Sequence, residues 1–95
     1  MWRMRKLTDG HCIVLNISGR IEAKELPELE EAVRSEKTAS PEVELDLEQV
    51  SLVGQQAVTF FARCEASGTR LRNCPAYIRE WIAREKAGKD RKREP

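Results

Sequence analysis

The feature that most constrains the fold is a short segment of strict alternation, EVELDL, at residues 42–47. Its apolar residues, Val43, Leu45 and Leu47, fall on one face of a strand, and its acidic residues fall on the other. A strand buried between two layers of helices would be apolar on both faces. The segment therefore predicts a strand with one dry and one wet face, in a sheet covered by helices on one side only.

Three further segments are expected to join this strand in a sheet. WRMRKL, residues 2–7, is expected to pair as a hairpin with CIVLNIS, residues 12–18, across Thr8-Asp9-Gly10, because Asp-Gly favours tight hairpin turns. TRLRN, residues 69–73, is a weaker strand in which only Leu71 is apolar. In CIVLNIS the residues that alternate onto one face are Ile13, Leu15 and Ile17.

Amphipathic spacing predicts a first and a third helix. The first helix has Pro27 in its opening turn and is expected to fade by Ser35, so that EKTASP is a loop. The third helix is expected to open at Pro75 and to end at Ala87-Gly88. The apolar residues at helical spacing are Leu26, Leu29 and Val33 in the first helix, and Ile78, Trp81 and Ile82 in the third.

A second helix is expected to begin near Gly54 and to stop near Gly68. At 100° per residue, its core face carries Ala57, Val58 and Phe61, flanked by Cys64. Phe60 falls on the boundary between this face and the polar one, so the pattern leaves it open whether Phe60 is core or an exposed anchor. The polar face carries Gln55, Gln56, Thr59 and Arg63.

The resulting order is β-β-α-β-α-β-α, and short strand–helix–strand connections imply parallel pairing with right-handed crossovers. We expect one α/β domain over residues 1–88, with a four-stranded mixed sheet covered by helices mainly on one face. The remaining segment, KDRKREP at 89–95, has no apolar residue and is expected to be a disordered, charged tail.

Composition and charge exclude several classes of protein. The 95 residues, 40% hydrophobic and 35% charged, are typical of one soluble domain, and a net charge of +1 favours neither nucleic acid nor membrane surfaces. No apolar run approaches the roughly 20 residues that span a bilayer. MWRMRKLTDG lacks the apolar centre of a signal peptide, and three cysteines suit reduced thiols. We therefore expect a cytoplasmic protein without membrane insertion.

No pattern in the chain indicates catalysis, a metal or a cofactor. His11 is the only histidine, and Cys12, Cys64 and Cys74 fall on three elements without CxxC spacing. The acidic residues are spaced as on solvated faces, and no Gly-rich phosphate loop is present. The basic residues of the tail are diluted by Asp90 and Glu94, which favours a solubilising role over nucleic-acid binding.

Two long segments, LNISGRIEAKELPELEEAV and VELDLEQVSLVGQQAVTFFARCEASGTRLRNCP, resemble a STAS domain, the module of bacterial anti-sigma-factor antagonists. The matching features are the SGRI turn, the LDL strand, the strand-to-helix junction, and the glycine before the last strand. The resemblance covers residues 3–85. It implies a non-enzymatic interaction domain that binds a partner through the helix over residues 54–63 and its flanking loop.

The junction departs from the family where phosphorylation would occur. In phosphorylated members it reads Asp-Ser-[Ser/Ala/Thr]-Gly-Leu, and a partner kinase modifies the first serine. This chain has Gln55 at the serine position and Gly54 at the acidic position. Because an amide cannot accept a phosphoryl group, we expect the switch to be absent here. The nearest hydroxyls belong to Ser51 and Thr59.

What remains by resemblance is a partner-binding surface of six residues: Gly54, Gln55, Gln56, Thr59, Phe60 and Arg63. Unpaired N–H groups at the helix start favour hydrogen bonds to a partner. The bland alternative is that Gln55 and Gln56 are merely solvated. The implied partner is an anti-sigma factor or kinase-like regulator. Alternatives are an accessory STAS subunit that clasps the ATPase of a lipid-type ABC transporter, and a nucleotide-binding STAS module. The oligomeric state stays open, a homodimer included.

Overall fold

The computed structural model describes residues 2–40 and 42–93, with side chains as far as Ala87. Four strands form one mixed sheet in the order β1-β2-β3-β4, antiparallel between β1 and β2 and parallel thereafter. The predicted fold class is confirmed. The elements in chain order are β1 (Trp2–Asp9), β2 (Cys12–Ile21), a short 3₁₀ helix η1 (Ala23–Glu25), α1 (Leu26–Ala39), β3 (Val43–Val53), α2 (Gln55–Ala66), β4 (Arg70–Arg72) and α3 (Ala76–Arg93).

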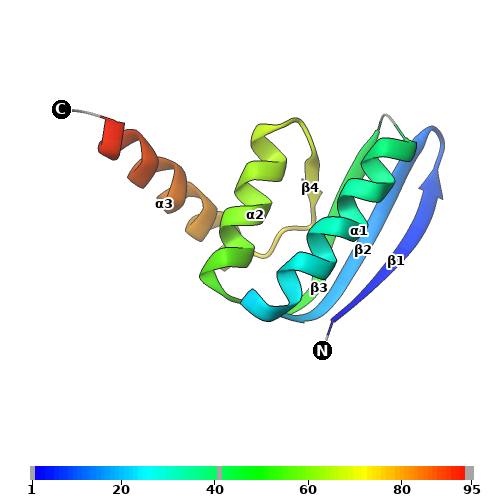
Figure 1. The fold of residues 1–95 in the computed structure, drawn as a ribbon, viewed down its shortest axis with the longest axis horizontal. Helices are drawn as coiled ribbons and strands as arrows, with labels where there is room; N and C mark the ends of the chain where they lie inside the picture. Colours follow the sequence, from blue (N-terminus) through cyan, green and yellow to red (C-terminus); the bar gives the residue numbers. More distant parts are fainter. Residues whose placement is uncertain (1, 41, 94–95) are drawn as a thin grey trace.

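Helices α1 and α2 lie side by side over one face of the sheet, and α3 extends outward beyond α2 (Figure 1). Side chains from all three helices join the sheet in one apolar cluster. In β3, Leu45 and Leu47 are fully buried in this cluster, whereas Glu44 is half-buried on the other face. The dry and wet faces predicted for EVELDL are therefore present.

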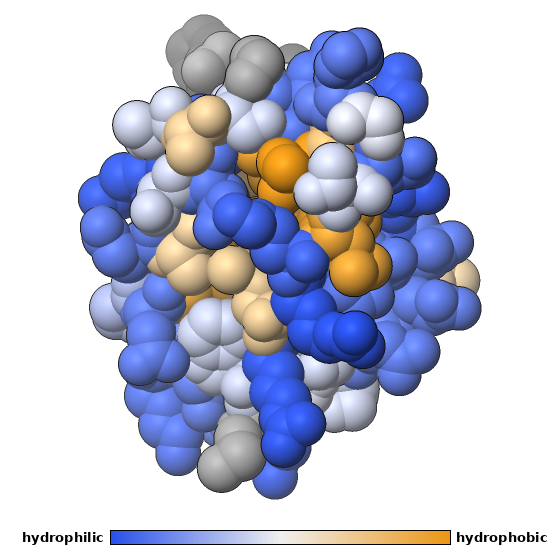
Figure 2. All heavy atoms as spheres, turned by 90° about the vertical axis from the view of Figure 1, so that its right-hand side faces the viewer, coloured by the Kyte–Doolittle hydropathy of each residue, from blue (hydrophilic) through white to orange (hydrophobic). Residues whose placement is uncertain are grey.

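The opposite face of the sheet also has a small apolar spot. Val14 is buried there, although it does not belong to the main core cluster. Its cross-strand neighbour Leu7 is exposed, and Figure 2 shows apolar atoms among hydrophilic ones on the side where β1 lies. Beside this spot, Arg72 on β4 approaches both Asp9, at 3.8 Å, and Glu44, at 3.3 Å.

The β1–β2 hairpin forms as predicted, but its turn falls slightly later along the chain. Asp9 pairs with Cys12, so the two turn residues are Gly10 and His11. Gly10 has φ of 65°, a left-handed conformation that suits glycine in a two-residue hairpin turn.

Helix α1 does not end at Ser35, as its apolar spacing suggested, but continues to Ala39. The additional turn has no buried apolar residue, and polar contacts support it instead. Lys6 on β1 pairs with Glu36 at 3.5 Å, and the backbone N–H of Ser40 donates to the Glu36 carbonyl at 2.9 Å. The predicted loop EKTASP is therefore mostly helix.

Helix α3 opens after Pro75 as expected, with Ile78 and Ile82 buried, but it does not stop at Gly88. It continues to Arg93, because a single glycine in a helix is tolerated and the lysines and arginines that follow are good helix formers. The predicted disordered tail is thus helical over residues 89–93, and residues 94–95 lie outside the described residues. Among the described residues, no helix is both long enough and apolar enough to cross a membrane.

Candidate functional site

The junction between β3 and α2 is built from an irregular strand. The pairing of β3 with β2 shifts register twice, between Asn16 and Ser18 and between Gly19 and Arg20. The end of β3 therefore departs from simple alternation, and both Val50 and Val53 reach the core. These two valines hold the strand in place directly before the helix begins.

Gly54 is the N-cap of α2, as the sequence predicted, with an extended backbone at φ −93° and ψ 173°. Its N–H donates to the Ile21 carbonyl at 2.9 Å, which ties the helix start to the end of β2. Its own carbonyl accepts the first helical hydrogen bond, from the Val58 N–H at 3.1 Å. Since glycine has no side chain to cap the helix, N–H groups of the first turn remain unpaired by the cap.

Four of the six predicted site residues converge on one shallow hollow of about 510 Å³. We call it the junction hollow, and it is lined by Leu26, Glu30, Gln55, Gln56, Thr59 and Arg63. Gln55 and Gln56 are exposed. Sequence reasoning missed the contribution of α1, namely Leu26 and Glu30, because only the packing of α1 beside α2 brings these residues to the site. Gly54 borders the hollow as the cap of α2 but does not line it.

Thr59 is less free than its place on the polar face of α2 suggested. Its hydroxyl lies 3.1 Å from the Gln55 carbonyl oxygen and 3.0 Å from a carboxylate oxygen of Glu85 on α3. The side chain is half-buried between the two helices. Substitutions at Thr59 would therefore disturb the contact between α2 and α3 as well as the hollow.

The next turns of α2 are tied to α3 by a second group of charged residues. Glu65 accepts from Arg79 at 2.7 Å and from Lys86 at 3.1 Å. Partial burial by itself would raise the pKa of Glu65, but the hydrogen bonds from Arg79 and Lys86 outweigh it and hold that pKa below its usual value. Together with Glu85, these residues tie α2 to α3, while Gln55 and Gln56 in the first turn and Arg63 further along the helix remain exposed.

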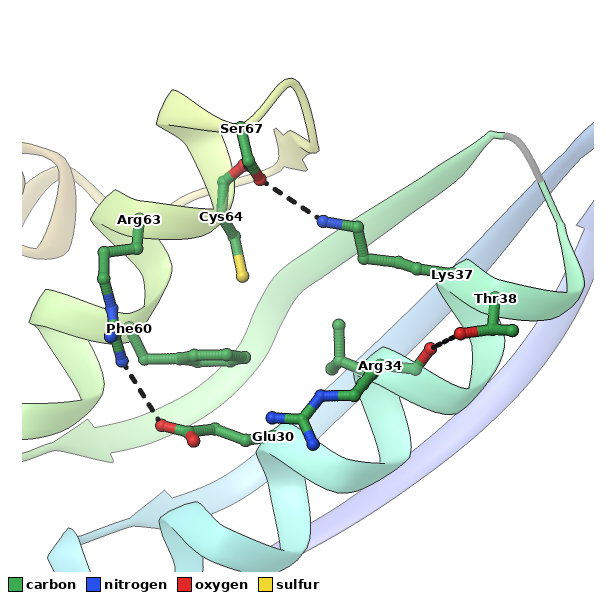
Figure 3. A pocket seen from close by; sticks show the side chains of 9 residues that line it. Glu30, Arg34, Lys37, Thr38, Phe60, Arg63, Cys64 and Ser67 are labelled. Carbon is green, nitrogen blue, oxygen red and sulfur yellow. Dashed lines mark hydrogen bonds and ion pairs between the residues drawn. The ribbon is translucent and has the colours of Figure 1, made fainter.

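The sequence pattern placed Phe60 on the boundary between the apolar and the polar face of α2. In the structure it belongs to the core. It is 8% exposed, its ring centroid is 5.6 Å from that of Phe61, and it belongs to the main apolar cluster. One part of the ring faces the space between α1 and α2 (Figure 3). Arg63, by contrast, is exposed and forms an ion pair with Glu30 across this space at 3.5 Å.

The histidine and the cysteines are spread over separate elements. His11 is exposed in the hairpin turn, Cys12 is half-buried in β2, Cys64 is buried in α2, and Cys74 lies between β4 and α3. Burial raises the pKa of Cys64 to about 11 and also raises the pKa of Cys74. These two thiols are protonated near neutral pH, a form that is a poor nucleophile. Within the described part of the chain, no group of three or more His, Cys, Asp or Glu residues could hold a metal ion.

Comparisons of the chain with models of known protein families and with curated proteins give no match. The resemblance to STAS domains therefore stands on the quoted residues alone.

Proposed function

We propose that this protein is a non-enzymatic, STAS-like interaction domain of the cytoplasm that binds a regulatory protein through the junction hollow. The observation that carries the proposal is the convergence of Gln55, Gln56 and Arg63 with the start of α1 on one accessible surface. By resemblance, the partner is an anti-sigma factor or a kinase-like regulator.

The chemistry of the hollow supports recognition rather than catalysis. The first turn of a helix presents about four unpaired N–H groups and a partial positive charge of roughly half a unit. The amides of Gln55 and Gln56 add donors and acceptors without a net charge. A backbone carbonyl or a carboxylate of a partner would find hydrogen-bond donors here.

The same surface has no phosphorylatable residue at the position where the family carries its switch. Gln55 occupies that position. Of the nearby hydroxyls, Thr59 is half-buried and engaged with Glu85, whereas Ser51 is exposed on β3. Binding would therefore be independent of phosphorylation at the helix start, and its regulation would come from elsewhere.

The experiment that tests the proposal compares two charge changes of the same kind. The protein carrying both Gln55→Glu and Gln56→Glu places two carboxylates in the hollow, while Gln49→Glu places one on an exposed position of β3 outside the hollow. Negative charge in a first helical turn stabilises the helix by about 0.3–1 kcal/mol, so the double variant remains folded.

Each protein is used for affinity capture from a native lysate, followed by mass spectrometry. We expect wild type and Gln49→Glu to capture the same partner, and the double variant to lose it, because an unmatched charge is costly to bury in an interface. Equal capture by the double variant would refute the proposal. A transporter ATPase as the captured protein would replace the sigma-pathway partner by the accessory-subunit alternative.

A further inference from the structure

A second cavity lies between α1 and α2, adjoins the junction hollow at Glu30 and Arg63, and has a volume of about 470 Å³. We call it the interhelical groove. Its apolar floor is formed by Val33, Phe60 and Cys64, which are 2%, 8% and 6% exposed. The volume falls within the range of small-molecule sites, about 300–1,000 Å³. The remaining lining residues are Glu30, Arg34, Lys37, Thr38, Arg63 and Ser67.

Two polar bridges connect the helices across this groove (Figure 3). Arg63 on α2 pairs with Glu30 on α1 at 3.5 Å, and Lys37 on α1 donates to the Ser67 hydroxyl on α2 at 3.3 Å. Between the two bridges lie the Phe60 ring and the Cys64 thiol. The groove is therefore a slot with a dry floor and a polar boundary.

The boundary is positively charged. Arg34, Lys37 and Arg63 face one carboxylate of the lining, Glu30, which is already paired with Arg63. Arg34 is paired outside the lining with Glu31, at 3.3 Å, in an exposed contact that contributes little to stability. Lys37 is exposed, donates to the Ser67 hydroxyl and forms no ion pair among the described residues. The groove thus combines apolar surface with a cation that no carboxylate among the described residues pairs with.

We propose that the interhelical groove binds a small amphiphilic anion, a carboxylate carried on an apolar chain or ring. The apolar part covers Val33, Phe60 and Cys64, and the carboxylate accepts a hydrogen bond from the Lys37 ammonium. A hydrogen bond between an ammonium and a carboxylate is charge-assisted, and such bonds are among the stronger ones. An anion without an apolar part would leave the floor uncovered. This proposal does not depend on the protein partner.

The probe is decanoate below its micelle concentration, added to the ¹⁵N-labelled protein. Isothermal titration measures affinity, and NMR shift changes locate the site. Decyltrimethylammonium has a matched chain with the opposite charge, and acetate has the matched head group without the chain. We expect decanoate to bind saturably with a 1:1 stoichiometry, with shift changes confined to α1 and α2, and neither control to saturate. Equal binding of the ammonium compound, or shift changes on another face, would overturn the proposal.

Substitutions separate a specific site from general adsorption. Lys37→Gln removes the ammonium that the proposal assigns to the carboxylate, and Lys24→Gln makes the same change on η1, outside the groove. Both lysines are exposed, so both variants should fold. Losing a charge-assisted hydrogen bond should weaken decanoate binding roughly tenfold in Lys37→Gln and leave it unchanged in Lys24→Gln. Equal affinities of the two variants would overturn the proposal. Saturation by a short Leu-Asp peptide and not by decanoate would also overturn it, and would place a protein segment in the groove.

Discussion

Replacing Phe60 by alanine tests whether this residue is part of the core or an anchor of the partner interface. The side chain is 8% exposed, so folding removes nearly all of it from water. Truncation of a buried phenylalanine costs about 3–5 kcal/mol. Because part of the ring lines the interhelical groove, the space left by alanine opens to solvent, which lessens the cavity penalty. We therefore expect Phe60→Ala to lower the free energy of unfolding by an amount near the low end of this range, about 3 kcal/mol.

Urea unfolding followed by circular dichroism measures this loss, and thermal unfolding checks it. At roughly 4–8 °C for each kcal/mol in a domain of this size, the Tm should fall by about 12–24 °C. Tyr77→Ala is the matched control, because Tyr77 is an aromatic that is 47% exposed on α3, and its truncation should cost less than about 1 kcal/mol. If Phe60→Ala cost no more than Tyr77→Ala while abolishing partner capture, the ring would be an interface anchor and the assignment to the core would be wrong.

Four further predictions follow from single residues. Gly54→Asp should raise stability by a few tenths of a kcal/mol in urea unfolding, because a Cβ there has no neighbour closer than 3.9 Å and aspartate caps a helix better than glycine; a loss of stability would contradict the cap geometry. Leu45→Asp should unfold the domain, since a buried unpaired charge costs several kcal/mol, whereas Glu44→Val should lose only a partly exposed ion pair; equal tolerance of the two by circular dichroism would overturn the strand register. Because the pKa of Glu65 is depressed in the folded protein, its contribution to stability is complete above about pH 4.5 and is lost as the pH falls through the lower folded pKa. The Tm of wild type should therefore drop more between pH 7 and pH 3 than the Tm of Glu65→Gln. Parallel curves of Tm against pH would show that the contacts with Arg79 and Lys86 contribute nothing to stability. Peptide mapping of protein isolated from its own cells should find no phosphate on residues 54–58, and a stoichiometric phosphate on Ser51 would show that the switch has moved.

Much of the fold could be predicted from the sequence, because apolar residues recur along a helix or strand with a period typical of that element. Alternation with a period of two identified the dry face of β3, and spacing of three and four identified the buried residues of α1, α2 and α3. Asp9-Gly10 marked the hairpin, and Gly54 marked the start of α2. Each of these signals depends on residues close together in the chain, so each could be read without knowing what lies opposite.

The ends of α1 and α3 were missed for a related reason. The last turn of α1 has no buried apolar residue, and residues 89–93 of α3 include no apolar residue at all, so the periodic signal stops before each helix does. In α1 a contact with Lys6, on a distant strand, helps to support the final turn. A helix end that depends on such a contact has no local signature.

The candidate site was only half visible in the sequence. The pattern identified Gln55, Gln56 and Arg63 as an exposed face, but it did not show that Thr59 touches Glu85, 26 residues away, or that Arg63 pairs with Glu30, 33 residues away. Both cavities lie along the seam between α1 and α2. Two helices in separate crossover connections become neighbours only because β2, β3 and β4 are adjacent and parallel in the sheet. The sequence thus determined which faces are dry and where each element begins, and the order of strands decided which polar residues meet.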